Sequence, residues 1–121
     1  MDRSGVEAWM EGYRRAWVAN DPDQVEALFT EDAVYSADAF QPPWHGRDEI
    51  IRRWTAGISQ DVDMDAEVWA VDGELALVHW NVKTRNHGDP VAVEYDGVIV
   101  LRFVGDRCRE LREWFFRRET R

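Results

Sequence analysis

Cysteine and long apolar runs are almost missing from this chain. Cys108 is the single cysteine among 121 residues, which excludes an internal disulfide framework and favours a reducing compartment. No apolar run approaches the ~20 residues of a membrane-spanning helix. The segment from Met1 to Trp17 lacks the basic-then-apolar order of a signal peptide. We therefore expect a cytoplasmic protein without a membrane segment.

Positive charge is also scarce. The 15 basic residues face 24 acidic ones, for a net charge of −9, whereas nucleic-acid binders are more often basic. The late arginines alternate with Glu110, Glu113 and Glu119, a pattern typical of an ion-paired strand. We expect no nucleic-acid partner.

Signatures of cofactor chemistry are missing as well. The sequence has no glycine-rich phosphate loop and no nucleophile motif. His45 and His87 fall in predicted loops, and neither has metal-ligand spacing to another histidine or to cysteine. The expectation is a protein without cofactor or metal.

Tryptophan, by contrast, is abundant. Seven tryptophans accompany a hydrophobic fraction of 45% in a chain of one-domain length, so residues 1–121 are expected to fold as a single domain. Tryptophan supplies large buried surface and often lines apolar pockets and interfaces. Core packing alone is the alternative explanation for these residues.

Helical signals come first along the chain. Ser4 and Glu7 have capping-box spacing, and the helix that follows should end near Asn20. Its apolar positions recur at helical spacing: Val6, Trp9, Met10, Tyr13 and Trp17. Asp21 and Pro22 mark the start of a second, short helix. A third should begin at Gly46, with its buried stripe formed by Ile50, Ile51, Trp54 and Ile58.

Strand signals dominate the rest. Residues 33–36 predict a short strand, residues 37–46 a loop, and after Gln60 the apolar period changes to two. Turns at Asp72-Gly73, residues 87–90 and Gly105-Asp106 separate the alternating stretch over residues 62–70 from strands at 74–86, 91–104 and 107–118. The order α-α-β-α-β-β-β-β predicts an α+β domain whose helices cover one face of an antiparallel sheet.

The other sheet face is predicted to be apolar too. An exposed patch of that size would be an association surface, so we expect a homodimer joined sheet to sheet about a twofold axis. The residues assigned to this face as partner contacts are Trp80, Val98, Val100, Trp114 and Phe116.

Three strings carry a resemblance to a known superfamily: AWVANDPDQVEALFTEDAVY, WHGRDEIIRRWTAG and DGVIVLRFVGDRCRELREWFF. Their order and spacing resemble nuclear-transport-factor-2-like proteins, in particular the SnoaL-like (polyketide cyclase) branch, over residues 4–119. The resemblance implies a cone, in which a curved sheet is wrapped by three helices around a pocket. It does not fix a function, because this fold hosts enzymes, carriers and interaction modules.

Two enzyme families of this fold can be compared residue by residue. Ketosteroid isomerases place a tyrosine at the position of Tyr13, but their base falls on Ala37 and their oxyanion acid on Ile99. Isomerase activity of that kind is not expected. Limonene epoxide hydrolases place an acid at the position of Glu113, while their arginine and second acid fall on His79 and Asn81.

Glu113 is the most informative candidate for chemistry. Strand alternation places it between Leu111 and Phe115, where a carboxylate is costly unless it is paired, protonated or used. Odd-length loops would align His79, Gly97 and Glu113 in one row, with the glycine leaving room for a ligand. His79 and Glu113 are therefore the candidate catalytic pair.

The other candidate ligand-binding residues are Tyr13, Trp17, Tyr35, Asn81, Tyr95, Ile99 and Phe115. A structural alternative pairs Glu113 with Arg109 or Arg52. Three functions remain open at this point: a cofactor-independent cyclase, isomerase or hydrolase acting on a small hydrophobic molecule, a non-catalytic binding module, and a dimerisation domain without a cavity.

Overall fold

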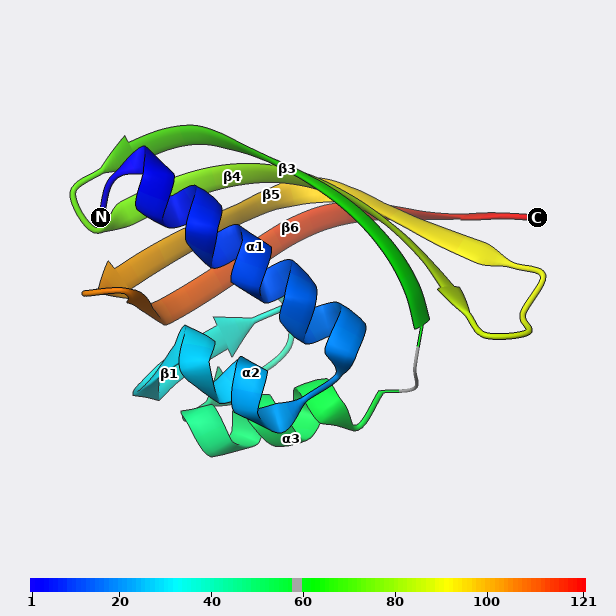
Figure 1. Cartoon of the computed structure of the whole chain (residues 1–121), viewed down its shortest axis with the longest axis horizontal. Helices are drawn as coiled ribbons and strands as arrows, with labels where there is room; N and C mark the ends of the chain where they lie inside the picture. Colours follow the sequence, from blue (N-terminus) through cyan, green and yellow to red (C-terminus); the bar gives the residue numbers. More distant parts are fainter. Residues whose placement is uncertain (58–59) are drawn as a thin grey trace.

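The structure, a computed structural model, describes residues 1–57 and 60–121. Ile58, predicted to continue the third helix, lies outside the described residues. The elements, shown in Figure 1, are α1 (Arg3–Ala19), α2 (Pro22–Leu28), β1 (Phe29–Ser36), β2 (Trp44–His45), α3 (Arg47–Thr55), β3 (Gln60–Asp72), β4 (Leu75–Asn86), β5 (Ala92–Val104) and β6 (Arg107–Thr120).

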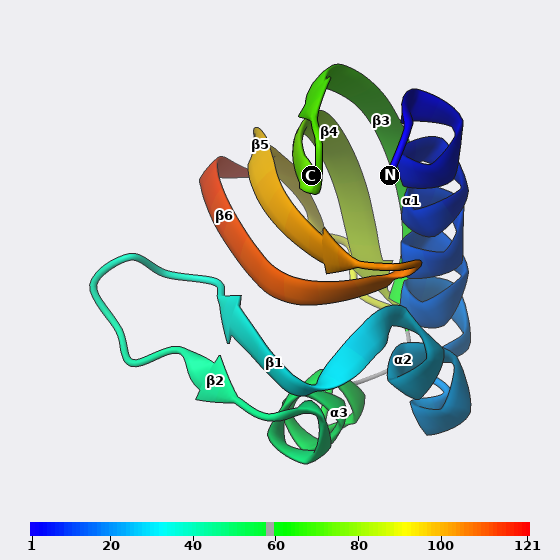
Figure 2. The same cartoon turned by 90° about the vertical axis from the view of Figure 1, so that its left-hand side faces the viewer.

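The strands form one sheet in the order β2-β1-β6-β5-β4-β3. Neighbouring strands are antiparallel except for β1 and β6, which run parallel. Figure 2 shows the sheet curling around α1, with all three helices on its concave side. The predicted α+β cone is confirmed, with the short strand β2 as an addition inside the predicted loop.

Helix boundaries follow local capping. Asp2 caps α1 by accepting a hydrogen bond from the backbone N–H of Gly5, so the predicted cap at Ser4 is wrong. The helix ends at Asn20 as predicted, in the left-handed conformation at φ 52°. Asp21 caps α2, also as predicted, by accepting from the N–H of Asp23.

In the β5–β6 hairpin each side chain lies on the predicted face, but the pairing of the two strands differs from the predicted register by two residues. Val104 pairs with Arg107 across a two-residue turn, which alone would reverse the faces. A bulge then places Arg109 as an extra residue, because Phe103 pairs with Cys108 and Arg102 with Glu110. The bulge restores the parity, and Glu113 stays on the concave face.

The β4–β5 hairpin differs from the prediction by one residue. Arg85 pairs with Ala92, whereas we expected Asn86 to pair with Pro90. Since side chains alternate, this slip moves every β4 side chain to the opposite face. His79 and Asn81 therefore face outward, and Trp80 faces inward.

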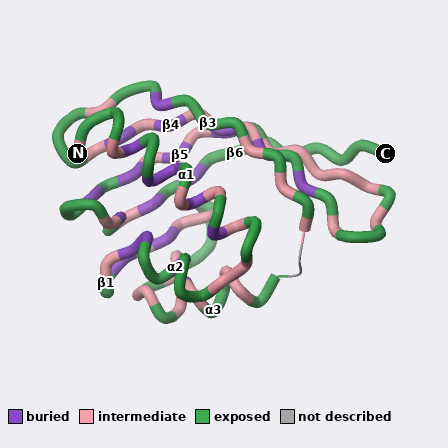
Figure 3. The backbone as a smooth tube through the Cα atoms, in the orientation of Figure 1, coloured by how far each residue is buried: buried purple, intermediate pink, exposed green. Residues whose placement is uncertain are grey.

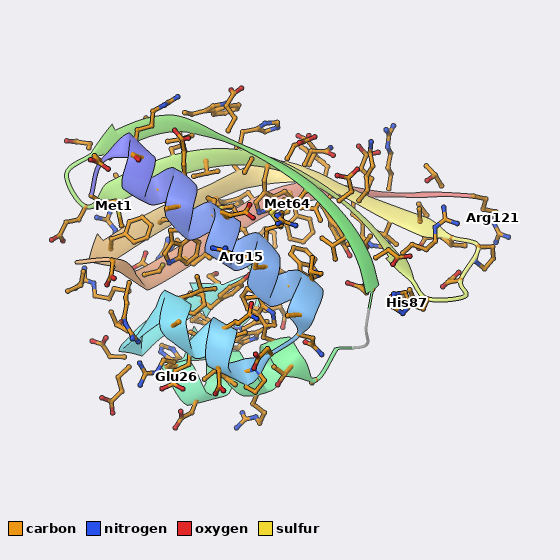
Figure 4. All side chains as sticks on the ribbon, in the orientation of Figure 1. Met1, Arg15, Glu26, Met64, His87 and Arg121 are labelled. Atoms are coloured by element: carbon orange, nitrogen blue, oxygen red, sulfur yellow. The ribbon has the colours of Figure 1, made fainter. Side chains whose placement is uncertain are left out.

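The core lies between α1 and the concave face of the sheet. Trp9 packs edge-on against Phe29 and Phe103 at ring-centroid distances of 5.8 and 5.6 Å. Its indole N–H donates to the carbonyl of Leu28 at 2.9 Å. Buried residues follow the strands and α1 (Figure 3), and many side chains lie between α1 and the sheet (Figure 4). No described helix is long and apolar enough to cross a membrane.

Gly97 sits where the backbone of β6 lies close to β5. A Cβ there would run into the backbone oxygen of Trp114 and would lie 2.7 Å from Cβ of Phe115. We expect Gly97→Ala to lower the free energy of unfolding by about 1–3 kcal/mol, measured by urea denaturation. The control is Gly12→Ala in α1, where only the flexible end of Leu28 lies near, at 3.2 Å, and helix propensity favours alanine by about 1 kcal/mol. Equal effects of the two changes would contradict this account.

Candidate functional site

A cavity of about 300 Å³ opens between the helices and the concave face of the sheet. That volume lies at the lower end of the range for small-molecule sites. The lining residues come from α1 and the segment after it, β1, β2, α3 and the segment after it, and β3 to β6: Tyr13, Trp17, Asn20, Tyr35, Trp44, Arg53, Trp54, Gly57, Gln60, Trp80, Tyr95, Glu113 and Phe115. Glu113 is the sole acidic residue among them.

Glu113 is buried, with 9% of its surface exposed. The hydroxyl of Tyr35 donates to Oε1 of Glu113 at 3.4 Å, and it lies 3.3 Å from the hydroxyl of Tyr13. None of the nine ion pairs found among the described residues includes Glu113. The alternative pairing with Arg109 or Arg52 is therefore not seen.

Burial controls the protonation of this cluster. Desolvation raises the pKa of Glu113 to about 8, against a smaller lowering by the Tyr35 hydrogen bond. Burial and the nearby Glu113 charge raise the pKa of Tyr13 and of Tyr35 well above the ordinary tyrosine value. At neutral pH the three groups are mostly protonated, so this cluster holds proton donors and little charge, while Arg53 elsewhere in the lining carries a positive charge.

Aromatic rings form two walls around this cluster. The first wall, from α1, β1, β2 and α3, contains Tyr13, Trp17, Tyr35, Trp44 and Trp54 in successive ring contacts. The second wall, from β4, β5 and β6, contains Trp80, Tyr95 and Phe115, which also contact one another. A bound molecule would meet aromatic faces or edges on both sides.

Trp80 adds an unused donor to the second wall. Its side chain is 2% exposed, and its indole Nε1 has no hydrogen-bond partner among the described residues. Two other polar groups of the lining are hydrogen-bonded within the protein. The indole N–H of Trp17 donates to Gln60 at 3.2 Å, and Asn20 donates to the carbonyl of Gly57 at 3.3 Å.

Most predicted ligand-binding residues do meet at this cavity. Glu113 and five of the seven predicted ligand-binding residues line it, namely Tyr13, Trp17, Tyr35, Tyr95 and Phe115. Ile99 is fully buried and pairs directly with Glu113 across the β5–β6 ladder, but it does not reach the lining. Asn81 lies on the outer face, where it donates to Glu94 and Asp96.

The predicted row of His79, Gly97 and Glu113 is wrong. Gly97 pairs with Trp80 and Phe115, while His79 pairs with Val98. The one-residue slip in the β4–β5 turn turns His79 outward, away from Glu113.

On the outer face His79 Nε2 lies 3.0 Å from Asp96 Oδ1. The imidazole ring stacks on Trp69 at a centroid distance of 5.0 Å. The structure therefore brings Glu113 together with the two tyrosines, and places the second predicted catalytic residue outside the cavity.

Seven further lining residues were not predicted to bind a ligand: Asn20, Trp44, Arg53, Trp54, Gly57, Gln60 and Trp80. Trp80 was assigned to the outer face by the wrong register, and Trp44 was placed in a loop. Trp54 was predicted to lie on the buried stripe of the third helix, and Gln60 to come just before the strand that follows. The only signal for Trp44 and Trp54 was their aromatic character, before and within the helix that begins at Gly46. The sequence alone does not tell where that helix lies relative to the sheet.

Glu113 makes the stability of the protein depend on pH. Its pKa rises from 4.5 in the unfolded chain to about 8 in the folded state, so the folded state retains a proton that the unfolded chain releases. Relative to Glu113→Gln, the free energy of unfolding should fall as pH rises from about 4.5 to about 8, at up to about 1.4 kcal/mol per pH unit. Urea denaturation of both proteins across this range is the measurement. A pH-independent difference would contradict the buried, protonated carboxyl.

Comparison with known proteins places this architecture in a family. The model of the SnoaL-like domain matches residues 6–111. No curated protein matches the sequence at a significant level. Among solved structures, an LEH-like epoxide hydrolase from M. tuberculosis has a TM-score of 0.72 at 20% identity, over 93% of this chain and 84% of that one.

Two further structures have the same fold. The epoxide hydrolase/cyclase-like enzyme SalBIII, which has a role in pyran ring formation in the polyether salinomycin, has a TM-score of 0.76 at 18% identity, over 95% of this chain and 93% of that one. A hypothetical protein with a ketosteroid isomerase-like fold from Catenulispora acidiphila DSM 44928, solved in complex with trimethylamine, has a TM-score of 0.72 at 16% identity, over 88% of this chain and 83% of that one. With most of its length matched by the family model, this chain belongs to the SnoaL-like domain family.

Proposed function

We propose that this protein binds a small, mostly apolar molecule between the two aromatic walls and that Glu113 donates a proton to it. The observation that carries the proposal is a buried carboxyl on a ligand-sized cavity, without an ion-pair partner among the described residues. A carboxyl whose pKa is about 8 holds its proton at neutral pH, as a general acid must.

The proposed step breaks one C–O bond and forms another. The carboxyl O–H of Glu113 donates its proton to the ligand oxygen whose C–O bond breaks, and a carboxylate remains. A water molecule, or a hydroxyl of the ligand itself in cyclisation, forms the new bond to that carbon and releases its own proton. The Tyr35 hydroxyl, 3.4 Å from Oε1, stabilises that carboxylate by donating to it. A proton from water or from the product restores the acid. The walls exclude bulk water and so strengthen these interactions.

Epoxide opening is the reaction class that the comparisons favour. One neighbour is described as an epoxide hydrolase and another as an epoxide hydrolase/cyclase-like enzyme. In both ring opening and cyclisation an epoxide oxygen accepts a proton as its C–O bond breaks. The apolar walls suit a hydrocarbon epoxide.

A second candidate function is binding of an organic amine without turnover. Aromatic rings around a carboxylate are the arrangement that recognises alkylated ammonium groups. Glu113 provides the anion, and the neighbour from Catenulispora acidiphila was solved with trimethylamine. In this case Glu113 would be ionised, and the cation would supply the partner that the carboxylate lacks.

Turnover of a neutral epoxide tests the first candidate. With cyclohexene oxide as the probe, we expect Glu113→Gln to lower the rate of diol formation by about 10²–10⁴-fold, because the amide cannot donate an acidic proton. Wild-type activity should decline as pH rises above about 8. The matched control is Glu110→Gln on the same strand, which bonds Arg112 on the opposite face and should keep full activity. Equal rates for Glu113→Gln and the wild type, or no turnover by the wild type, would contradict the acid role.

A charge-matched pair of ligands tests the second candidate. Choline and its neutral isostere 3,3-dimethylbutan-1-ol have nearly the same shape, and binding of each can be followed by tryptophan fluorescence. If the site binds amines, choline affinity should increase about tenfold for each unit of pH increase up to about pH 8, because the carboxylate must be ionised. The affinity should be lost in Glu113→Gln. Equal affinity for both ligands at every pH would exclude it.

A further inference from the structure

One side of the cavity is polar, and the proposed function does not use it. Figure 1 shows the end of α1, the end of α3 and the start of β3 at the same end of the molecule. Four lining residues from these segments form what we call the polar rim: Asn20, Arg53, Gly57 and Gln60. All four are half-buried or exposed, whereas Glu113 and its two tyrosine neighbours are buried. The cavity therefore meets solvent at the polar rim.

Hydrogen bonds within the protein engage the amide groups of the polar rim. The side-chain amide of Asn20 donates to the carbonyl of Gly57 at 3.3 Å. Gln60 accepts from the indole N–H of Trp17 at 3.2 Å and donates to Asn86 at 2.8 Å. These contacts tie the ends of α1 and α3 to the start of β3 and fix the polar rim in place.

Arg53 is the one charged residue of the polar rim, and its guanidinium remains open to a ligand. Its Nε lies 3.9 Å from Oε1 of Glu49, beyond hydrogen-bond distance, and its side chain is 56% exposed. A guanidinium carries its N–H donors in a planar fork that matches the two oxygens of a carboxylate. The polar rim can therefore hold an anion.

We propose that Arg53 binds the carboxylate of the ligand while the apolar part of the ligand lies between the aromatic walls. This inference rests on the function proposed for the cavity, and it names the substrate class as a hydrophobic epoxy acid. A single guanidinium neutralises a monoanion such as a carboxylate. A phosphate ester carries close to two charges at neutral pH, and the second would stay uncompensated in a chain of net charge −9.

Trp54 connects the polar rim with the buried acid. It follows Arg53 in α3, and its ring centroid lies 5.2 Å from that of Tyr13 and 6.2 Å from that of Tyr35. A ligand lying against Trp54 would thus reach from the polar rim to the tyrosines beside Glu113. The carboxylate belongs at the rim, where water still solvates it, because burying a second acid's charge next to Glu113 is costly. The epoxide then faces the carboxyl group of Glu113.

A charge-matched pair of ligands tests the carboxylate site. Octanoate and octanamide have nearly the same shape, and binding of each at pH 7 in low salt can be followed by tryptophan fluorescence. The measured quantity is the ratio of the octanamide dissociation constant to the octanoate dissociation constant. Arg53→Glu should lower this ratio about five- to tenfold, because an attractive contact becomes a repulsive one. The matched control is Arg52→Glu, since Arg52 is exposed on the same helix, carries the same charge and lies outside the lining.

The outcomes separate this site from the acid role of Glu113. Arg52→Glu should keep the wild-type ratio, and circular dichroism of both variants confirms folding. An unchanged ratio in Arg53→Glu, an equal drop in both variants, or no octanoate binding by the wild type would overturn the carboxylate site. Turnover of cyclohexene oxide by the wild type tests the acid role separately, because that probe has no carboxylate. A ratio that depends on Arg53 without any such turnover would overturn the acid role and keep the carboxylate site.

Discussion

Packing of α1 into the curve of the sheet is the contact on which the rest of this structure depends. Trp9 wedges between Phe29 and Phe103, and Arg3 donates two hydrogen bonds to the carbonyl of Val68, at 2.8 and 2.7 Å. The helix is thereby fixed at its start and along its length. Tyr13, further along α1, reaches the hydroxyl of Tyr35 and so defines one side of the cavity.

Because of that packing, the carboxyl group of Glu113 is buried where water cannot stabilise its ionised form. Glu113 lies on the concave face of β6, and desolvation dominates its protonation. A cation beside it would have held the carboxylate ionised. With tyrosine hydroxyls as its neighbours, the carboxyl keeps a proton that a bound molecule can take, or exchanges it for a bound cation. The same geometry thus serves catalysis and binding.

Much of the fold follows from local patterns. Asn20, Asp21 and Pro22 mark helix boundaries that the structure reproduces, since capping depends on a few adjacent residues. The burial of Glu113 also follows from its position between Leu111 and Phe115. The cavity residues near it were less accessible to prediction. Trp44 and Trp54 reach the cavity through the turn from β1 to α3, whose path depends on long-range contacts.

The sequence by itself determined the α+β class, the boundary between α1 and α2 and the inward position of Glu113, because those features depend on short-range capping and on period-two alternation. Only the tertiary structure decided the strand registers. One residue in the β4–β5 turn and one bulge at Arg109 set which side of each strand faces the cavity. Alternative registers differ in free energy mainly through the packing of the whole sheet, which the local sequence does not reveal. For that reason His79 lies on the outer face instead of at the predicted site, and Trp80 lines the cavity.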